Sequence, residues 1–194
     1  MAQRSLREAL LGAAAAEFHE KGYAATGVAA IAARAGAPKG SFYNHFASKD
    51  DLAVLVVDGY SATRGVEILL DPDADPVDAL RRHFEHLRDD LAVREYALGC
   101  LLGNLAGEVA GSGTSVEQSV RTSLAAWTEA ITVTVGRAAE QGRLPAGTDV
   151  AATGRFLAGA WEGAALLAKA SGDPAPIDDF FAVAFARVLG PVTG

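Results

Sequence analysis

Cysteine and long apolar runs are what this 194-residue chain has least of, and each shortage excludes a class of protein. The single cysteine, Cys100, excludes an intrachain disulfide and any CxxC metal or redox site. No stretch approaches the roughly 18 uninterrupted apolar residues of a membrane span. The N-terminus has neither the apolar region nor the cleavage site of a secretory signal. We therefore expect a soluble cytoplasmic protein without a membrane partner.

The composition is that of a folded domain. Apolar residues make up 50% of the chain and charged residues 21%, and the mean hydropathy is +0.17. Such a chain can fill a core, which argues against a disordered or fibrous protein. The length fits one domain, or one small module fused to a larger partner.

Charge is distributed unevenly along the sequence. The net charge is −7, but residues 1–49 carry six Lys/Arg against three acids, a net of +3, and residues 50–194 carry eleven against twenty-one, a net of −10. A change in the sign of the net charge between a short first part and a long remainder suggests two functions, in which the basic part binds an anion. Fluctuations of this size are common, so the split needs a motif to support it.

The pattern of residues predicts an all-α fold, because alanine is abundant and strand-like alternation is confined to Ile131–Val135. About nine helices are expected, with turn-rich breaks at 71–76, 111–115 and 172–176. The expected segments are 5–21, 28–35, 38–46, 48–70, 77–91, 96–110, 116–141, 149–170 and 177–189. We expect the fourth to be one continuous helix that bridges a small basic head and a larger body.

Residues 26–46 carry the most informative pattern. Two short helices separated by a tight glycine-containing turn form a helix-turn-helix, whose second helix can enter the major groove of DNA. Phe42 and Phe46 are four residues apart and supply its core side. The outward positions hold groups that suit phosphates and base edges, and glycine allows a close backbone approach. They are Lys39, Gly40, Ser41, Tyr43, Asn44 and His45.

Four short motifs within residues 5–55 support this interpretation. They are Gly22-Tyr23-Ala-Ala-Thr26, Ile31-Ala-Ala-Arg-Ala-Gly36, Lys39-Gly-Ser-Phe-Tyr-Asn-His-Phe46 and Lys49-Asp-Asp-Leu52. In this order they resemble the tetracycline-repressor (TetR) family of bacterial regulators. Gly27 departs from the family, where Thr or Ser is common, and so does Ala37-Pro38 in place of Val-Ser. Beyond residue 55 only the length and the helix count agree.

The resemblance implies a role for individual residues of the head, which spans residues 1–50. It implies phosphate contacts from four side chains of the motif and from Thr26 at the start of the second helix, and base-edge contacts from Lys39 and Asn44. The four are Ser41, Tyr43, His45 and Lys49. The alternative for Tyr43 and His45 is that they merely pack on the first helix. Arg4 and Arg7 are interpreted as a solvated end rather than a DNA-following arm, and Arg34 as part of a solvated face.

For residues 51–194 the resemblance implies an inducer-binding and dimerisation domain. Small residues on one face of segment 149–170 let another helix approach closely, and the phenylalanines of 177–189 add apolar bulk. Two such helices per chain can form a four-helix interface about a twofold axis, matching a palindromic operator. The competing interpretation is that both helices are ordinary intrachain core.

The candidate inducer pocket mixes apolar bulk with a few polar groups, as small-molecule cavities do. Its expected residues are Tyr96, Cys100, Asn104, Trp127 and Trp161. The run Leu98–Glu108 resembles a segment of one family branch that contains Gly-Cys-Leu, and some regulators of that branch respond to electrophiles or unsaturated acids. A cation such as Lys169 near Cys100 would activate the thiol, but a lone cysteine among leucines is usually inert. We favour reversible ligand binding over a thiol-based electrophile sensor.

Other classes of function have less support. A helical enzyme lacks a phosphate loop, a serine elbow and a metal-ligand cluster, since His83 and His86 have no third ligand and fit a solvated face. A pure dimeric scaffold does not explain the polar recognition helix. The expected function is a ligand-responsive repressor that binds a palindromic operator as a homodimer and is released by a small-molecule inducer. We expect no enzymatic activity, cofactor or metal.

Overall fold

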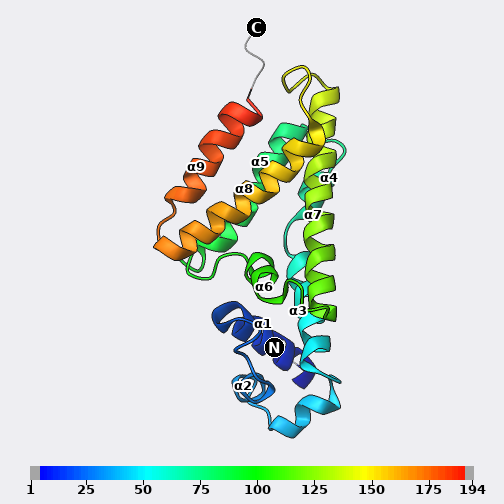
Figure 1. The fold of residues 1–194 in the computed structure, drawn as a ribbon, viewed down its shortest axis with the longest axis vertical. Coiled ribbons are helices and arrows are strands. Elements are labelled where there is room, and N and C mark those ends of the chain that lie inside the picture. Colours follow the sequence, from blue (N-terminus) through cyan, green and yellow to red (C-terminus); the bar gives the residue numbers. More distant parts are fainter. Residues whose placement is uncertain (1–4, 191–194) are drawn as a thin grey trace. The chain divides into compact units, whose positions relative to one another are not determined.

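The computed structural model describes residues 5–190, and over this range every regular element is helical (Figure 1). The elements are α1 (Leu6–Lys21), α2 (Val28–Arg34), the 3-10 segment η1 (Lys39–Asn44), α3 (Lys49–Ala62), α4 (Val66–Leu70), α5 (Pro76–Ala92), α6 (Leu101–Val109), α7 (Ser115–Glu140), α8 (Val150–Ser171), α9 (Ala175–Val183) and the π-helical turn η2 (Ala184–Val188). The predicted all-α fold is confirmed. Within residues 5–190, no helix combines the length and the apolar character that crossing a membrane requires.

The expected continuous helix over 48–70 is wrong. Ser48 caps α3, since its side chain accepts a hydrogen bond from the Asp51 N–H, but the helix ends at Ala62. Gly65 then adopts a left-handed conformation, with φ of +65°, before α4 begins. A left-handed residue cannot continue a right-handed helix. Gly65 is itself a local sign of this break in the sequence.

Two further segments differ from expectation. The recognition segment is the 3-10 element η1 rather than an α-helix. Six residues that include Gly40 are too few, and too poor in helix formers, to favour an α-helix. The Ser41 hydroxyl donates to the Pro38 carbonyl at 2.6 Å. The segment expected from 96 becomes helical only at Leu101, because Tyr96 and Gly99 both have positive φ.

The described chain divides into two compact units. The first contains the residues up to Thr63 together with Leu101–Ser123. In it α1 packs against α2, α3 and α6. Its fully buried side chains centre on Leu10, Phe18, Ile31, Phe42 and Leu52. The recognition segment therefore rests on a core built by three helices.

The second unit contains Arg64–Cys100 and the residues from Leu124 onward. Its core is aromatic: the ring centroids of Phe84 and Phe180 lie 4.7 Å apart, and Trp161 lies 5.3 Å from Phe84 and 5.2 Å from Phe180. Helices α8 and α9 lie side by side (Figure 1). Helix α7 also approaches α8 closely, since a Cβ on Gly154 would lie 2.8 Å from the Cα of Thr132.

Candidate functional site

The turn between α1 and α2 is fixed by side chains from three directions. Gly22 ends α1 with φ of +86°. The hydroxyl of Thr26 donates to the carbonyl of Gly22 at 2.7 Å and lies 3.3 Å from that of Glu17. Thr26 is only 2% exposed, so its side chain shapes the turn and does not face a phosphate in this conformation.

Lys49 holds the same turn from the start of α3. Its ammonium group donates to the carbonyls of Tyr23 at 3.0 Å and Thr26 at 3.1 Å, and lies 4.0 Å from the centroid of the Tyr23 ring. Two of its three N–H groups are therefore used within the first unit. The Tyr23 hydroxyl donates to Asp50. The pKa of Tyr23 is raised, mainly by burial and also by this hydrogen bond.

Helix α6 supplies the third contact to this turn. The carboxylate of Glu108 accepts hydrogen bonds from the backbone N–H groups of Tyr23 at 3.2 Å and Ala24 at 2.9 Å. Sequence reasoning did not find this role, because 85 residues separate Glu108 from Tyr23 and no local pattern links them. Glu108 thus contributes to positioning the helix-turn-helix.

Arg34 is exposed, in agreement with the solvated face that we expected, and it also links α2 to α1 through ion pairs. Its guanidinium donates to Glu17 at 3.0 Å and to both carboxylate oxygens of Glu20 at 2.5 and 2.7 Å. Lys21 also donates to Glu17, at 2.7 Å. The hydrogen bonds from Lys21 and then Arg34 hold the pKa of Glu17 below its usual value.

The recognition segment divides its side chains between the core and the solvent. Phe42 and Phe46 are buried, with ring centroids 5.5 Å apart. Five of the predicted DNA-contacting residues are exposed, and Ser41 is half-buried. The exposed residues are Lys39, Gly40, Tyr43, Asn44 and His45. The edge-to-face contact of Tyr43 with Phe42, at 5.2 Å, orients its ring while leaving it 59% exposed.

Of the two N-terminal arginines, the structure describes only Arg7. Arg4 lies outside the described residues. The guanidinium of Arg7 lies 5.3 Å from the centroid of the Phe46 ring, which sets this cation beside the recognition segment. The surface as a whole presents amide, phenol, imidazole and cationic groups on a short rigid element. Such groups can bind phosphates and read base edges in a DNA groove.

The five expected pocket residues are divided between the two units. Asn104 belongs to α6 in the first unit, and the other four belong to the second. Tyr96 is half-buried against the second core. Trp161 is fully buried in the aromatic cluster, and its indole N–H has no hydrogen-bond partner there.

Arg64, at the joint between α3 and α4, is the centre of a buried polar network. Its guanidinium lies 4.8 Å from the centroid of the Trp127 ring. One terminal nitrogen is 3.5 Å from the sulfur of Cys100 and the other is 3.4 Å from Glu162. Burial raises the pKa of Glu162, and the positive charge of Arg64 opposes this effect.

His83 joins the same network. We expected it on a solvated face, but its side chain is fully buried. The indole N–H of Trp127 donates to its Nε2 at 2.8 Å, so Nδ1 carries the proton and donates to the Gly65 carbonyl at 3.2 Å. Burial lowers the pKa of His83 to about 4, which keeps the ring neutral. The joint at Gly65 is therefore bound to α5 and, through His83, to α7.

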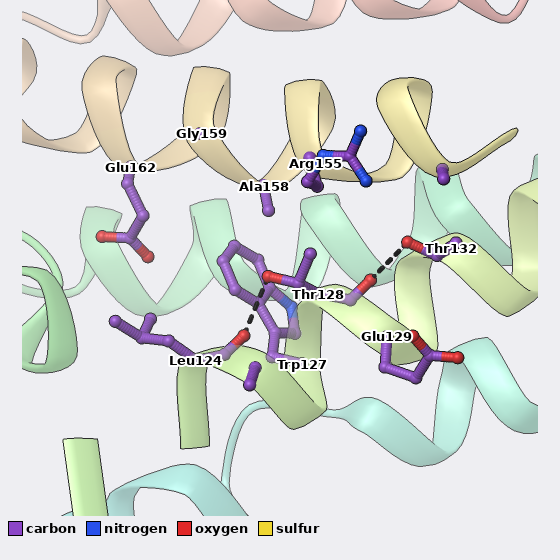
Figure 2. A pocket seen from close by; sticks show the side chains of 11 residues that line it. Leu124, Trp127, Thr128, Glu129, Thr132, Arg155, Ala158, Gly159 and Glu162 are labelled. Atoms are coloured by element: carbon purple, nitrogen blue, oxygen red, sulfur yellow. Dashed lines mark hydrogen bonds between the residues drawn. The ribbon is translucent and has the colours of Figure 1, made fainter. Parts of the chain in front are cut away.

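A pocket of about 550 Å³ opens between α7 and α8 in the second unit (Figure 2). Among the five expected residues, only Trp127 lines it. The full lining is Leu124, Ala125, Trp127, Thr128, Glu129, Thr132, Ala151, Arg155, Ala158, Gly159 and Glu162. Among residues 5–190, no cluster of three or more His, Cys, Asp or Glu side chains is placed to hold a metal ion.

Two family models match this chain. The model of bacterial regulatory proteins of the tetR family matches residues 10–56. The model described as the tetracyclin repressor-like C-terminal domain matches residues 76–184. Together they cover the recognition segment and most of the second unit.

Individual proteins match over most of their length. The chain is 29% identical over 192 residues to the HTH-type transcriptional repressor DhaR of Mycobacterium sp. strain GP1, covering 97% of this chain and 95% of that protein. It is 30% identical over 176 residues to the transcriptional regulator AcuR of Cereibacter sphaeroides, covering 89% and 80%. A crystal structure of a TetR regulatory protein from Rhodobacter sphaeroides superposes with a TM-score of 0.82 at 30% identity, covering 91% and 96%.

Proposed function

Since this chain belongs to the TetR family of bacterial transcriptional regulators, we propose that it is a ligand-responsive repressor. It binds a palindromic operator as a homodimer and is released by a small-molecule inducer. The observation that supports DNA recognition most directly is the exposed polar row of η1, which rests on the buried Phe42 and Phe46. Its relative DhaR is described as a transcriptional repressor, which favours repression over activation.

Within the recognition surface the roles follow from chemistry. Asn44 and Lys39 are the base-edge readers, because an amide can form a bidentate contact with adenine and an ammonium can donate to guanine. Tyr43, His45 and Ser41 contact phosphates, and Gly40 admits the DNA backbone. Lys49 and Thr26 act mainly by fixing the turn that presents η1.

The homodimer forms through an exposed apolar stripe on α8. Phe156, Leu166 and Leu167 are 52%, 60% and 59% exposed, although each is a large apolar side chain. Gly159 and Gly163 lie between them, and a Cβ on either would meet nothing within 4 Å. This combination of small and large residues suits a close crossing with the same helix of a second copy. The buried Phe180 of α9 and Phe185 of η2 belong to the intrachain core.

The inducer acts in the second unit, through the pocket between α7 and α8. A ligand shifts a conformational equilibrium only if it binds one state better than the other. Glu162 lines this pocket and also pairs with Arg64, which directly follows the last residues of α3. A ligand that engages Glu162 therefore changes what holds Arg64, and this change is passed to α3 and the recognition segment.

A second candidate is an electrophile-sensing repressor that uses Cys100. The observation that favours it is the cation beside the thiol, since a guanidinium nitrogen of Arg64 lies 3.5 Å from Sγ. The stem of Lys169 also packs against Gly99, where a Cβ would lie 3.1 Å from Cδ. Against it, Cys100 is only 3% exposed. Operator release by N-ethylmaleimide that is lost in Cys100→Ser would favour this candidate over reversible binding.

DNA binding can be tested directly by selecting duplexes from a random pool with the purified chain. We expect a palindrome whose half-sites are separated by about one helical turn, or a multiple of it. Fluorescence anisotropy should then give much tighter binding to the selected duplex than to random DNA, with both affinities falling as salt rises. Equal affinity for selected and random duplexes would contradict the proposed repressor.

A further inference from the structure

The polar groups inside the pocket between α7 and α8 are mostly hydrogen-bond acceptors. The hydroxyl of Thr128 donates its proton to the carbonyl of Leu124 at 2.8 Å, and that of Thr132 donates to the carbonyl of Thr128 at 2.8 Å. A hydroxyl has one proton and two lone pairs. While these bonds persist, both threonines can only accept hydrogen bonds from a bound molecule (Figure 2).

The charged groups that line the pocket are also mostly hydrogen-bond acceptors. The lining contains two carboxylates, Glu129 and Glu162, and one cation, Arg155. In Figure 2, Arg155 lies at the end of the pocket opposite Glu162. Glu162 retains 22% of its side-chain exposure, and its bond to Arg64 is long, at 3.4 Å. Because a carboxylate has about four lone-pair sites, Glu162 can accept a further hydrogen bond beside those from Arg64 and Cys100.

The remaining walls are apolar and well supported. Trp127 stands beneath Ala158 in Figure 2, with Leu124 beside it. The indole of Trp127 is fixed because its N–H donates to His83, so the ring offers its apolar surface and no hydrogen. A pocket of about 550 Å³ falls within the ordinary range for small organic ligands.

We propose that this pocket binds a small organic amine, with its apolar body against Trp127 and its ammonium group donating to Glu162 and to the hydroxyl of Thr128 or Thr132. An ammonium group supplies up to three hydrogens where the protein offers acceptors, and its bond to a carboxylate is charge-assisted. An organic anion would meet two carboxylates and find its one cation at the exposed end. The binding of an amine in this pocket does not depend on the proposed function. The role of that amine as the inducer rests on the proposed function.

Calorimetric titration of the full chain tests the ligand class, using 2-phenylethylamine as the probe. Two comparison compounds of similar shape are 2-phenylethanol and 3-phenylpropionate. We expect saturable binding of the amine, at least tenfold weaker binding of the alcohol and no binding of the carboxylate. Equal binding of amine and alcohol, preference for the carboxylate, or no binding of the amine would each overturn the proposal.

Two pairs of variants locate the bound amine. Ala125 lines the pocket and Ala126 does not, and both are exposed on α7. Ala125→Trp should abolish amine binding, and Ala126→Trp should leave it unchanged. Glu162→Gln should weaken amine binding at least tenfold, with Glu140→Gln as its control. Thr128→Val, which does not touch Arg64, should weaken it severalfold even if Glu162→Gln destabilises the fold.

The same variants distinguish binding in this pocket from binding elsewhere and from occupation of the groove by a second copy of the chain. Amine binding that survives Ala125→Trp would place the ligand elsewhere and overturn the proposal. Conversion of the protein from dimer to monomer by Ala125→Trp, measured by light scattering, would show that a second copy occupies this groove, and would also overturn it. Operator release is measured separately. Amine binding without operator release supports the site and contradicts the inducer role proposed for this pocket.

Discussion

Adjacent residues of the recognition segment offer different chemistry to DNA. Asn44 presents an amide, which can read a base edge through two hydrogen bonds, and Tyr43 presents one hydroxyl, which suits a phosphate. Both side chains are exposed, so neither is committed to the core. Substitution at these two positions should therefore separate sequence preference from general affinity.

We expect Asn44→Ala to relax preference at one base pair of each half-site, by about 1–3 kcal/mol if the contact is bidentate. Tyr43→Ala should weaken binding to all duplexes alike, because a phosphate carries no sequence information. Anisotropy titrations with the operator, its single-base variants and random DNA measure both effects. A loss for Asn44→Ala that is equal on operator and random DNA would remove its assignment as a reader.

His83 should make stability depend on pH. Its pKa is about 4 in the folded protein, against 6.5 for an ordinary histidine. Below pH 6.5 the unfolded state takes up a proton that the folded state refuses, so the free energy of unfolding falls as pH drops toward 4. At about 1.4 kcal/mol per pKa unit, the full effect is about 3 kcal/mol. It is absent above pH 7 and reaches its limit below pH 4.

Urea unfolding of His83→Asn at several pH values between 7.5 and 4.5 tests this linkage. The variant should be less stable than wild type at pH 7.5, because Trp127 loses its acceptor, and the difference should shrink as pH falls. His45→Asn, at an exposed histidine, serves as the control and should keep the wild-type slope. Parallel curves for wild type and His83→Asn would contradict the assignment.

The roles of single residues could be predicted from sequence where they follow from local pattern. Phe42 and Phe46 point inward and Tyr43 and Asn44 outward because one short element fixes both sets. The burial of His83 could not be predicted, since it depends on Trp127, 44 positions later. Glu108 was unpredictable for the same reason. Contacts of this kind are set by how distant helices pack, which no local spacing encodes.

At the scale of elements, the helix-turn-helix depends on a turn that is held by two other helices, α3 and α6. Glu108 of α6 accepts the N–H groups of Tyr23 and Ala24, and Lys49 of α3 binds the carbonyls of Tyr23 and Thr26. The backbone between α1 and α2 is thus bound on both sides. The presentation of η1 to DNA is then a property of α3 and α6 as well as of the motif itself.

We expect Glu108→Ala to weaken operator binding several-fold without changing base preference, because the turn loses two backbone hydrogen bonds while η1 keeps its side chains. Glu140→Ala, at an exposed residue of α7, is the matched control. Anisotropy gives the affinity, and amide hydrogen exchange at Tyr23 and Ala24 should accelerate in Glu108→Ala alone. Unchanged exchange at these two amides would contradict the role of Glu108.

Helix boundaries show which structural features a local sequence pattern can predict and which it cannot. The cap at Ser48 and the glycine that ends α1, Gly22, each act within one turn, so a local sequence pattern is enough to encode them. The break at Gly65 was missed, although a glycine inside an expected helix can mark the end of that helix. The break is stabilised by the bond from His83 to the Gly65 carbonyl and by the contacts of Arg64 with Trp127 and Glu162. Both are tertiary contacts.

At the scale of the whole molecule, a palindromic operator requires two recognition segments in fixed relation, and the exposed stripe on α8 is where we expect the second copy. Gly163→Leu tests this expectation cleanly. Gly163 is exposed, and a Cβ added there would meet nothing within 4 Å in the single chain, so the variant should fold normally. In a close helix crossing between copies, however, the leucine would clash.

We therefore expect Gly163→Leu to be monomeric by light scattering, with circular dichroism like that of wild type and greatly reduced operator affinity. The matched control is Gly107→Leu, on an exposed helical glycine of α6 that also has nothing within 4 Å of its Cβ position. It should remain a dimer. Because a monomer contacts a single half-site, the loss in Gly163→Leu should be large on the full palindrome and small on a half-site duplex. A dimeric Gly163→Leu would place the interface on another surface.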